Sequence, residues 1–294
     1  MKSKGKLIFA GAALGIAAMS LLGCKSKVVN TDYNTVQKRL DDSISALVVD
    51  VKEIRVKLLP SQDSSVHLQY PENEDLQWNI SLKNGVLTIQ ENRKSTWFSW
   101  TVIDDDDKAS LRIALPESAC PALTVNAGSA DVTVDGRLQF ADVELNTSSG
   151  DAEFEAKAQS LHMSASSGDL DLRNTEIGAL TMHTSSGEVK VENVTCTSAQ
   201  AHTSSGEIEL HGVTASGELE MKTSSADIEL ERCDAASLTL KTSSGDIEAE
   251  LLTPKTIQTH TSSGSVRVPP TSSQSGGSCT ANTSSGSIKI TFAP

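Results

Sequence analysis

A row of carboxylates recurs at a fixed place in a repeated segment. Exact copies of Thr-Ser-Ser-Gly start at Thr147, Thr184, Thr203, Thr242, Thr261 and Thr283, and degenerate copies start at Ala127, Ala165 and Thr223. An acid follows four residues after the start of seven consecutive copies: Asp131, Asp151, Asp169, Glu188, Glu207, Asp227 and Asp246. Stacked carboxylate oxygens are natural Ca²⁺ ligands, which makes cation binding one hypothesis. The other is that each acid accepts backbone N–H groups at a turn. We favour the second, because the Gly-Gly-x-Gly-x-Asp pattern of calcium-binding repeats is absent.

The serines and histidines of the repeat do not form a nucleophilic site. A serine nucleophile needs a base and an orienting acid, and the serine rows lack both. His183 and His202 precede the first Thr of neighbouring copies and could bind a transition metal, but a third ligand is missing. Successive copies are only 18 to 22 residues apart, which leaves no long loops to wall a cleft. The sequence therefore predicts no enzyme.

The repeat itself predicts the elements that carry these side chains. A period near 19 residues is typical of a solenoid, in which each unit buries its apolar face against its neighbours. Apolar and polar residues alternate on both sides of the turn, as in Leu180-Thr-Met182 and Val189-Lys-Val191, which indicates half-buried strands. We predict an all-β fold, a parallel β-solenoid (β-helix) of about nine coils of 18–22 residues over residues 123–294.

The parity of the apolar positions indicates where each coil turns. Inward residues of one strand lie an even number apart, so the first Thr of each copy should face inward. The next inward position is five residues later, which requires a corner in Ser-Ser-Gly, where glycine tolerates positive φ. A weaker apolar pair, such as Val194 and Cys196, predicts a third face for each coil.

The first residues look like an export signal. Lys2, Lys4 and Lys6 precede an apolar run that ends in Leu21-Leu22-Gly23-Cys24, which resembles a bacterial lipobox. We expect residues 1–23 to be a lipoprotein signal peptide and Cys24 to carry the lipid. A polar tether would then extend over residues 24–45. Two or more acyl chains would hold the protein firmly on an extracytoplasmic membrane surface.

Residues 46–122 alternate like strands without a visible repeat, and we predict an irregular β cap for the solenoid. Trp97, Phe98 and Trp100 form an aromatic cluster in this segment. A recognition patch is one interpretation of the cluster, and packing of the cap is the favoured one.

The net charge limits the classes of binding partner, and the spacing of the cysteines indicates whether they form disulfides. The formal net charge of −13 argues against nucleic acid and anionic lipid headgroups as direct partners. Cys196, Cys233 and Cys279 fall in different columns of non-adjacent coils, too far apart for disulfides. They are predicted to be small buried hydrophobes, while the state of Cys120 stays open.

The lipobox, the segment ending in Arg112-Ile-Ala-Leu-Pro116 and coils of the type Leu-x-x-x-Thr-Ser-Ser-Gly-Asp-Ile-x-Val resemble the bacterial "putative adhesin" domain-of-unknown-function family. The resemblance covers roughly residues 45 to 292 and implies an extracytoplasmic β-solenoid without catalytic residues. We therefore predict a lipid-anchored cell-envelope protein that serves as a non-catalytic adhesion or interaction surface for an envelope or extracellular protein or glycan. A self-assembling envelope scaffold or a stress-sensing accessory protein is the alternative, and a polysaccharide-active enzyme is the least favoured.

Overall fold

The computed structural model describes residues 33–94, 109–119, 121–270 and 276–294. Within these ranges the chain forms 24 β-strands, most of them in parallel pairs, and no helix. The described residues thus contain no helix able to cross a membrane. The predicted all-β solenoid is confirmed. Cys24, Cys120, Trp97, Phe98 and Trp100 lie outside the described residues, so their roles stay predictions.

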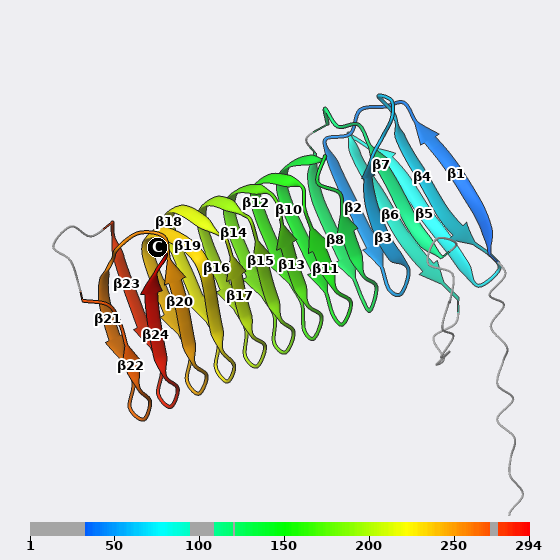
Figure 1. Ribbon diagram of the computed structural model, residues 1–294. Coiled ribbons are helices and arrows are strands. Elements are labelled where there is room, and N and C mark those ends of the chain that lie inside the picture. The colour runs from blue at the N-terminus through cyan, green and yellow to red at the C-terminus, as the bar shows by residue number, and fades with distance from the viewer. Residues whose placement is uncertain (1–32, 95–108, 120, 271–275) are drawn as a thin grey trace, which may run out of the picture.

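Two sheets run along the rod, and Figure 1 shows the coils stacked from the first strands to the last. Sheet A consists of β1 (Asn34–Leu40), β3 (Arg55–Pro60), β4 (Val66–Glu72), β7 (Ser110–Leu115), β9 (Val132–Val134), β11 (Ala152–Phe154), β13 (Leu170–Arg173), β15 (Val189–Glu192), β17 (Ile208–His211), β20 (Ile247–Leu251), β22 (Val266–Arg267) and β24 (Ile288–Phe292). Sheet B consists of β2 (Ala46–Val51), β5 (Leu76–Lys83), β6 (Val86–Arg93), β8 (Ala122–Ala127), β10 (Gln139–Thr147), β12 (Lys157–Ser164), β14 (Glu176–His183), β16 (Thr195–His202), β18 (Thr214–Lys222), β21 (Thr256–His260) and β23 (Ser278–Asn282). The long strand β19 (Ile228–Lys241) belongs to both sheets.

Like residues stack on like residues from coil to coil. Leu161 pairs with Leu180 in sheet B, and Leu170 pairs with Val189 in sheet A. The inward columns of the two sheets form one continuous core. The predicted inward columns before and after the Thr are therefore confirmed for the coils between residues 123 and 251.

The first Thr of the repeat is buried, as parity predicted. Thr147, Thr184, Thr203, Thr223, Thr242 and Thr283 are all buried. The Thr203 hydroxyl accepts the N–H of Gly206 at 3.0 Å and donates to the carbonyl oxygen of Gly187, one coil back, at 3.5 Å. Because an unpaired buried backbone group costs about 1–3 kcal/mol, this hydroxyl explains why the position holds threonine and not valine.

The corner glycines are required by close stacking, and the expected positive φ is absent from them. A methyl group on any of the seven corner glycines would lie only 1.7–2.0 Å from a carbonyl oxygen of the adjacent coil. Ala226 replaces glycine in one coil and is only half-buried, whereas Gly206 and Gly245 on either side are buried. Ala130 also stands at a corner position and is buried, at 2% exposed.

Positive φ occurs instead at the second corner of the coil. Asn174, Asn193 and Arg232 have φ between 52° and 54°, and Gly212 has φ 62°. Asparagine and glycine tolerate this conformation better than other residues. The Asn193 side chain also donates to that of Asn174 at 3.1 Å, so this corner is tied from coil to coil as well.

The predicted third face is not a separate sheet. Cys196 and Ala199 both point inward although they are three residues apart, and both lie in β16. The pairing of β16 with β18 shifts register between them. The parity change therefore occurs at a bend within a continuous strand. The register shift comes from one extra residue in β18, because β16 keeps its register with β14 across the same bend.

The N-terminal end departs from the plain solenoid. β2 and β3 stack in register on β8 and β9, with Leu47 opposite Leu123 and Val56 opposite Val132. Residues 46–58 therefore form one more coil, which the sequence does not reveal because Lys52-Glu53-Ile54 stands in place of the usual corner. Antiparallel β1, β4 and β5 lie further out, at this end of the rod.

The order of coils is exchanged at the C-terminal end. β24 pairs with both β20 and β22, and β23 pairs with both β19 and β21. The last coil of the chain, residues 278–292, is thus inserted between its two predecessors. Residues 256–268, called the end rung below, form the outermost layer (Figure 1).

Candidate functional site

A groove runs along sheet B where its long strands bend. It has a volume of about 1060 Å³ and crosses the strands from β10 to β19, together with the loop after β20. Its lining residues are Gln139, Phe140, Lys157, Ala158, Gln159, Glu176, Ile177, Gly178, Thr195, Cys196, Thr197, Thr214, Ala215, Ser216, Asp234, Ala235, Ala236, Leu252, Thr253, Lys255 and Gly276. Seven stacked layers at about 4.8 Å each make the groove roughly 29 Å long.

The floor of the groove is apolar. Each strand contributes one nearly buried side chain to it, and these are Phe140, Ala158, Ile177, Cys196, Ala215 and Ala235. Most are small, which keeps the floor low between the outward residues on either side of the bend. The result is an apolar strip parallel to the axis of the rod.

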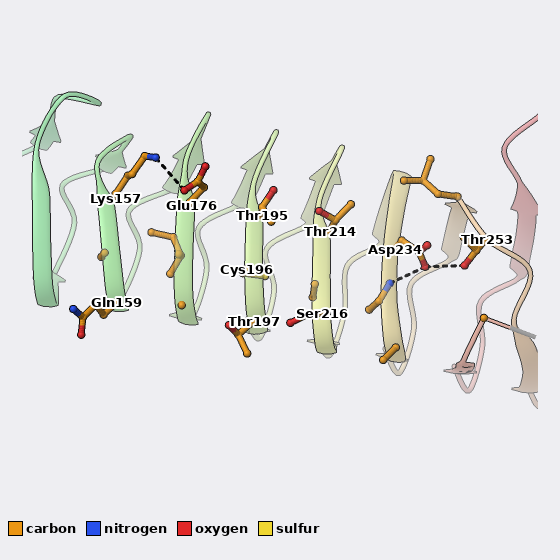
Figure 2. Close-up of a pocket in the computed structure, with 18 of the residues that line it drawn as sticks. Lys157, Gln159, Glu176, Thr195, Cys196, Thr197, Thr214, Ser216, Asp234 and Thr253 are labelled. Carbon is orange, nitrogen blue, oxygen red and sulfur yellow. Dashed lines mark hydrogen bonds and ion pairs between the residues drawn. The ribbon is translucent and has the colours of Figure 1, made fainter.

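Polar side chains form the two rims, as Figure 2 shows. One rim carries Thr195 and Thr214 at its centre, and the other carries Thr197 and Ser216. Thr195, Thr197 and Ser216 are exposed to solvent. The middle of the groove therefore presents two rows of hydroxyls, which can both donate and accept hydrogen bonds.

The charged residues of the groove cancel one another. Lys157 pairs with Glu176 at 3.0 Å near one end. Lys255 pairs with Asp234 at the other end. The groove is thus neutral, although the whole chain has a formal charge of −13.

Lys255 closes the C-terminal end of the groove. Its side chain is 1% exposed, and its ammonium donates to the carbonyl oxygens of Ala235 at 2.6 Å and Gly276 at 2.7 Å. It also contacts the Thr253 hydroxyl at 2.9 Å. A buried amino group must be hydrogen-bonded to offset its desolvation, and these partners give Lys255 a structural role.

The groove residues do not form a catalytic arrangement. No histidine is among the residues that line it. Burial raises the pKa of the Cys196 thiol to about 11, so this sulfur is a poor nucleophile at neutral pH. Burial likewise raises the pKa of Cys279 to about 11 and that of Cys233 to about 12. All three are free and buried, which confirms them as small buried hydrophobes.

The predicted acidic row lies on the outer surface beside sheet A, and its aspartates hold backbone groups. All seven acids are exposed or half-buried: Asp131, Asp151, Asp169, Glu188, Glu207, Asp227 and Asp246. Asp169 accepts the N–H of Glu188 in the next coil at 2.8 Å. The same bond recurs for the other aspartates at 2.7–3.2 Å. The aspartates thus accept backbone N–H groups, as the favoured hypothesis supposed, but these belong to the next coil and not to the acid's own corner.

The two glutamates of the row have a different environment. Partial burial, followed by the charges of neighbouring acids, raises the pKa of Glu188 and Glu207. Glu207 can bring a carboxylate oxygen within 4.8 Å of one each from Glu209 and Glu229. Exposed acidic groups often cluster without a metal, and cation binding here stays a prediction.

Two further groups of polar residues have a structural role. The rings of His183 and His202 lie on the outer face with centroids 5.3 Å apart and planes tilted by 53°, as neighbours in a polar ladder. Near the N-terminal end, Asp63 contacts His67 at 2.8 Å and Arg39 at 3.1 Å. Hydrogen bonds from His67 and from the Ser65 backbone lower the pKa of Asp63 to about 2. This cluster ties β1 to β4 and the turn before it.

Sequence reasoning missed the groove, although one signal was available. The apolar pair of Val194 and Cys196 was interpreted as a third face, and the residues that flank Cys196 and Ala215 are hydroxyl-bearing. Lys255 gave no signal, since its partners meet only through the exchanged order of the last coils.

Comparison with known proteins is consistent with this architecture. The family model described as Toastrack DUF4097 matches residues 44–291. A structure described as a putative lipid binding protein from Parabacteroides distasonis is similar at a TM-score of 0.52 and 17% identity, covering 89% of this chain and 97% of that one. A putative adhesin from the same organism is similar at a TM-score of 0.51 and 15% identity, covering 88% and 98%. At these identities the likeness extends to the fold alone. No curated protein matches the chain.

Proposed function

The chain belongs to the Toastrack DUF4097 family, and from that premise we propose that it is a non-catalytic binding protein of the bacterial cell envelope that holds a neutral, extended glycan in the sheet B groove. The observation that carries the proposal is the straight, neutral groove with an apolar floor and hydroxyl rims. A lipid on Cys24 would fix the N-terminal end of the rod to a membrane.

The shape of the groove favours a polymer over a compact metabolite. Five successive strands, β12, β14, β16, β18 and β19, each contribute an outward residue, a buried floor residue and another outward residue, and the groove is open along its length (Figure 2). A small ligand would usually be enclosed on most sides by a pocket. An extended ligand can gain affinity here by repeating one weak contact along successive coils.

The chemistry of the lining favours a neutral glycan. Sugar rings present apolar C–H faces together with hydroxyls, which match a floor of Ala215 and Cys196 between rims of threonine and serine. The paired charges at the ends leave no net field to attract a charged polymer, and the acidic surface beside sheet A repels polyanions. The adhesion or interaction surface predicted from the sequence is thereby narrowed to one face of the rod.

The binding test uses the protein from residue 25 onward against an array of linear neutral and anionic glycans, with palmitate as a separate probe. Thr197→Trp places a large side chain on the rim at the centre of the groove. Gln200→Trp is its matched control, because Gln200 is exposed on the same strand but does not line the groove. We expect a neutral glycan to bind the parent and the control but not Thr197→Trp.

Three results would contradict this proposal. They are binding of anionic glycans or palmitate alone, equal binding by Thr197→Trp, and no binding to any neutral glycan on the array. Anchoring is tested separately by metabolic labelling with an alkyne analogue of palmitate. The label should appear on the parent and be lost in Cys24→Ala, and an unlabelled parent would rule out the lipid anchor.

A further inference from the structure

The exchanged order of the last coils separates one segment from the regular solenoid. In a regular coil, the inward residues Leu230 and Leu238 are eight residues apart. Ala249 and Cys279, which pair with them in the neighbouring layer, are 30 residues apart. Yet β20 and β24 pair directly, with Ile247 opposite Ile288. The solenoid thus continues from β20 to β23 and β24 as if residues 252–277 were an insertion.

The base of this insertion is closed by specific contacts. The N–H of Gly276 donates to the carbonyl oxygen of Pro254 at 2.7 Å, which joins its two ends. Lys255 binds Gly276 on one side and Ala235 with Asp234 on the other. The insertion is therefore fastened to the preceding coil.

The end rung within the insertion has the character of a terminal layer. Val266 and Val268 occupy inward columns but are 42% and 39% exposed, and with Leu252 they make up the exposed large hydrophobics of the described residues. Ser265 stands where seven earlier coils have an acid, as does Ser287 in the coil beneath, and residues 256–268 contain no carboxylate. β22 has only two residues and is followed by Pro269 and Pro270, which lack N–H donors. Short strands and prolines are known devices that make a sheet edge unsuitable for pairing.

The rung covers a surface that would otherwise be well suited to pairing. Beneath it, Cys279 and Ala281 are 0% exposed, and Ile288 and Ile290 are 1% and 2% exposed. β23 and β24 have the regular repeat pattern and complete strands of five residues. Left bare, they would present an apolar layer and two rows of unpaired backbone groups, which is a template for another chain.

We propose that the end rung, residues 256–268, is a built-in cap that prevents the rods from stacking end to end. The cap leaves Val266 and Val268 partly exposed, and it buries the regular coil of β23 and β24, whose bare surface would pair more readily with another chain. At the other end, the antiparallel strands β1, β4 and β5 interrupt the parallel stacking. Terminal repeats with atypical sequence have this role in other solenoids, where solubility depends on them.

The test replaces residues 250–278 with the seven-residue connection of a regular coil, residues 231–237, so that Ala249 leads to Cys279 with regular spacing. Light scattering coupled to size exclusion should show a monomeric parent and a variant whose mass rises with concentration. Far-UV circular dichroism and a cooperative melt establish that the variant is folded. A folded variant that stays monomeric, or a parent that itself stacks end to end, would overturn the proposal.

A second variant covers the case in which the deletion does not fold. Pro269→Thr combined with Pro270→Val keeps the whole insertion but lengthens the edge strand and supplies donors. Thr239→Val, on the outer face of β19 and two layers inside the end rung, is the control. Association of the double variant but not of the control supports the cap, and a monomeric double variant contradicts it.

Discussion

Gly187→Ala is the most direct test of how closely the coils stack. The added methyl carbon would lie 2.0 Å from the carbonyl oxygen of Gly168 and 2.6 Å from its carbon. Real Cβ atoms do not approach closer than about 3.0 Å, so the two coils must separate locally by roughly 1 Å or the corner must swing outward. Overpacking of this kind costs about 1–3 kcal/mol.

Part of that cost is offset in the unfolded chain. Alanine has fewer unfolded conformations than glycine, which stabilises the folded state by about 0.4–1 kcal/mol where the backbone fits. The net loss expected for Gly187→Ala is therefore about 1–2 kcal/mol. At roughly 2–4 °C per kcal/mol for a chain of this size class, the melting midpoint should fall by several degrees. Urea unfolding followed by circular dichroism measures the free energy directly.

Gly136→Ala is the matched control. Its methyl carbon would meet the nearest atom, Cβ of Glu155, at 3.4 Å, an ordinary contact, and Gly136 does not have positive φ. This variant should be as stable as the parent or slightly more so. If Gly187→Ala were as stable as Gly136→Ala, close stacking would not be the reason for the corner glycines.

Three further substitutions test other parts of the coil. Thr203→Val leaves the N–H of Gly206 unpaired in the core and should cost about 1–3 kcal/mol in urea unfolding, while the outward Thr239→Val should stay within about 0.5 kcal/mol of the parent; equal losses would contradict the buried hydroxyl's role. Asp169→Ala should cost about 0.5–1.5 kcal/mol and Asp169→Asn much less, because the amide oxygen still accepts the N–H of Glu188; a difference between Asp and Asn that requires Ca²⁺ would instead favour cation binding. Because the pKa of Asp63 is lowered to about 2, its stabilising effect is complete above the unfolded value near 3.9 and is lost as the pH falls through about 2, so Asp63→Asn should be less stable than the parent at pH 7, and most of that difference should be gone at pH 2. A difference of the same size at both pH values would refute that assignment.

The repeating part of the fold could be predicted from the sequence because equivalent residues of successive repeats occupy the same environment. The columns of Leu180, Met182 and Val189 define two inward faces, and the parity between them places Thr184 inside. The reason for glycine at the corner was not predictable, because positive φ and a close carbonyl select the same residue. The structure distinguishes Gly187, where a carbonyl oxygen of the adjacent coil leaves no room for a side chain, from Gly212, which has φ 62°.

The ends and the groove depended on information that the repeat does not contain. The exchange of the last two coils leaves no mark in the sequence, because Ile257 and Ile288 look alike there as inward residues. Residues 46–58 form a coil without the repeat's corner sequence. The groove arises from a bend inside strands such as β16, where the inward parity changes without any glycine or proline to mark it.

The hydrogen bonds between coils have a mechanical consequence. They all run roughly along the rod, so a pull on the N-terminal strand loads them one layer at a time and peels β1 from β4 before it reaches the next layer. Peeling requires little force, and each released layer can re-form when tension ends. A polymer bound across seven layers would instead connect them in parallel, so that the rod resists tension most strongly when its groove is filled.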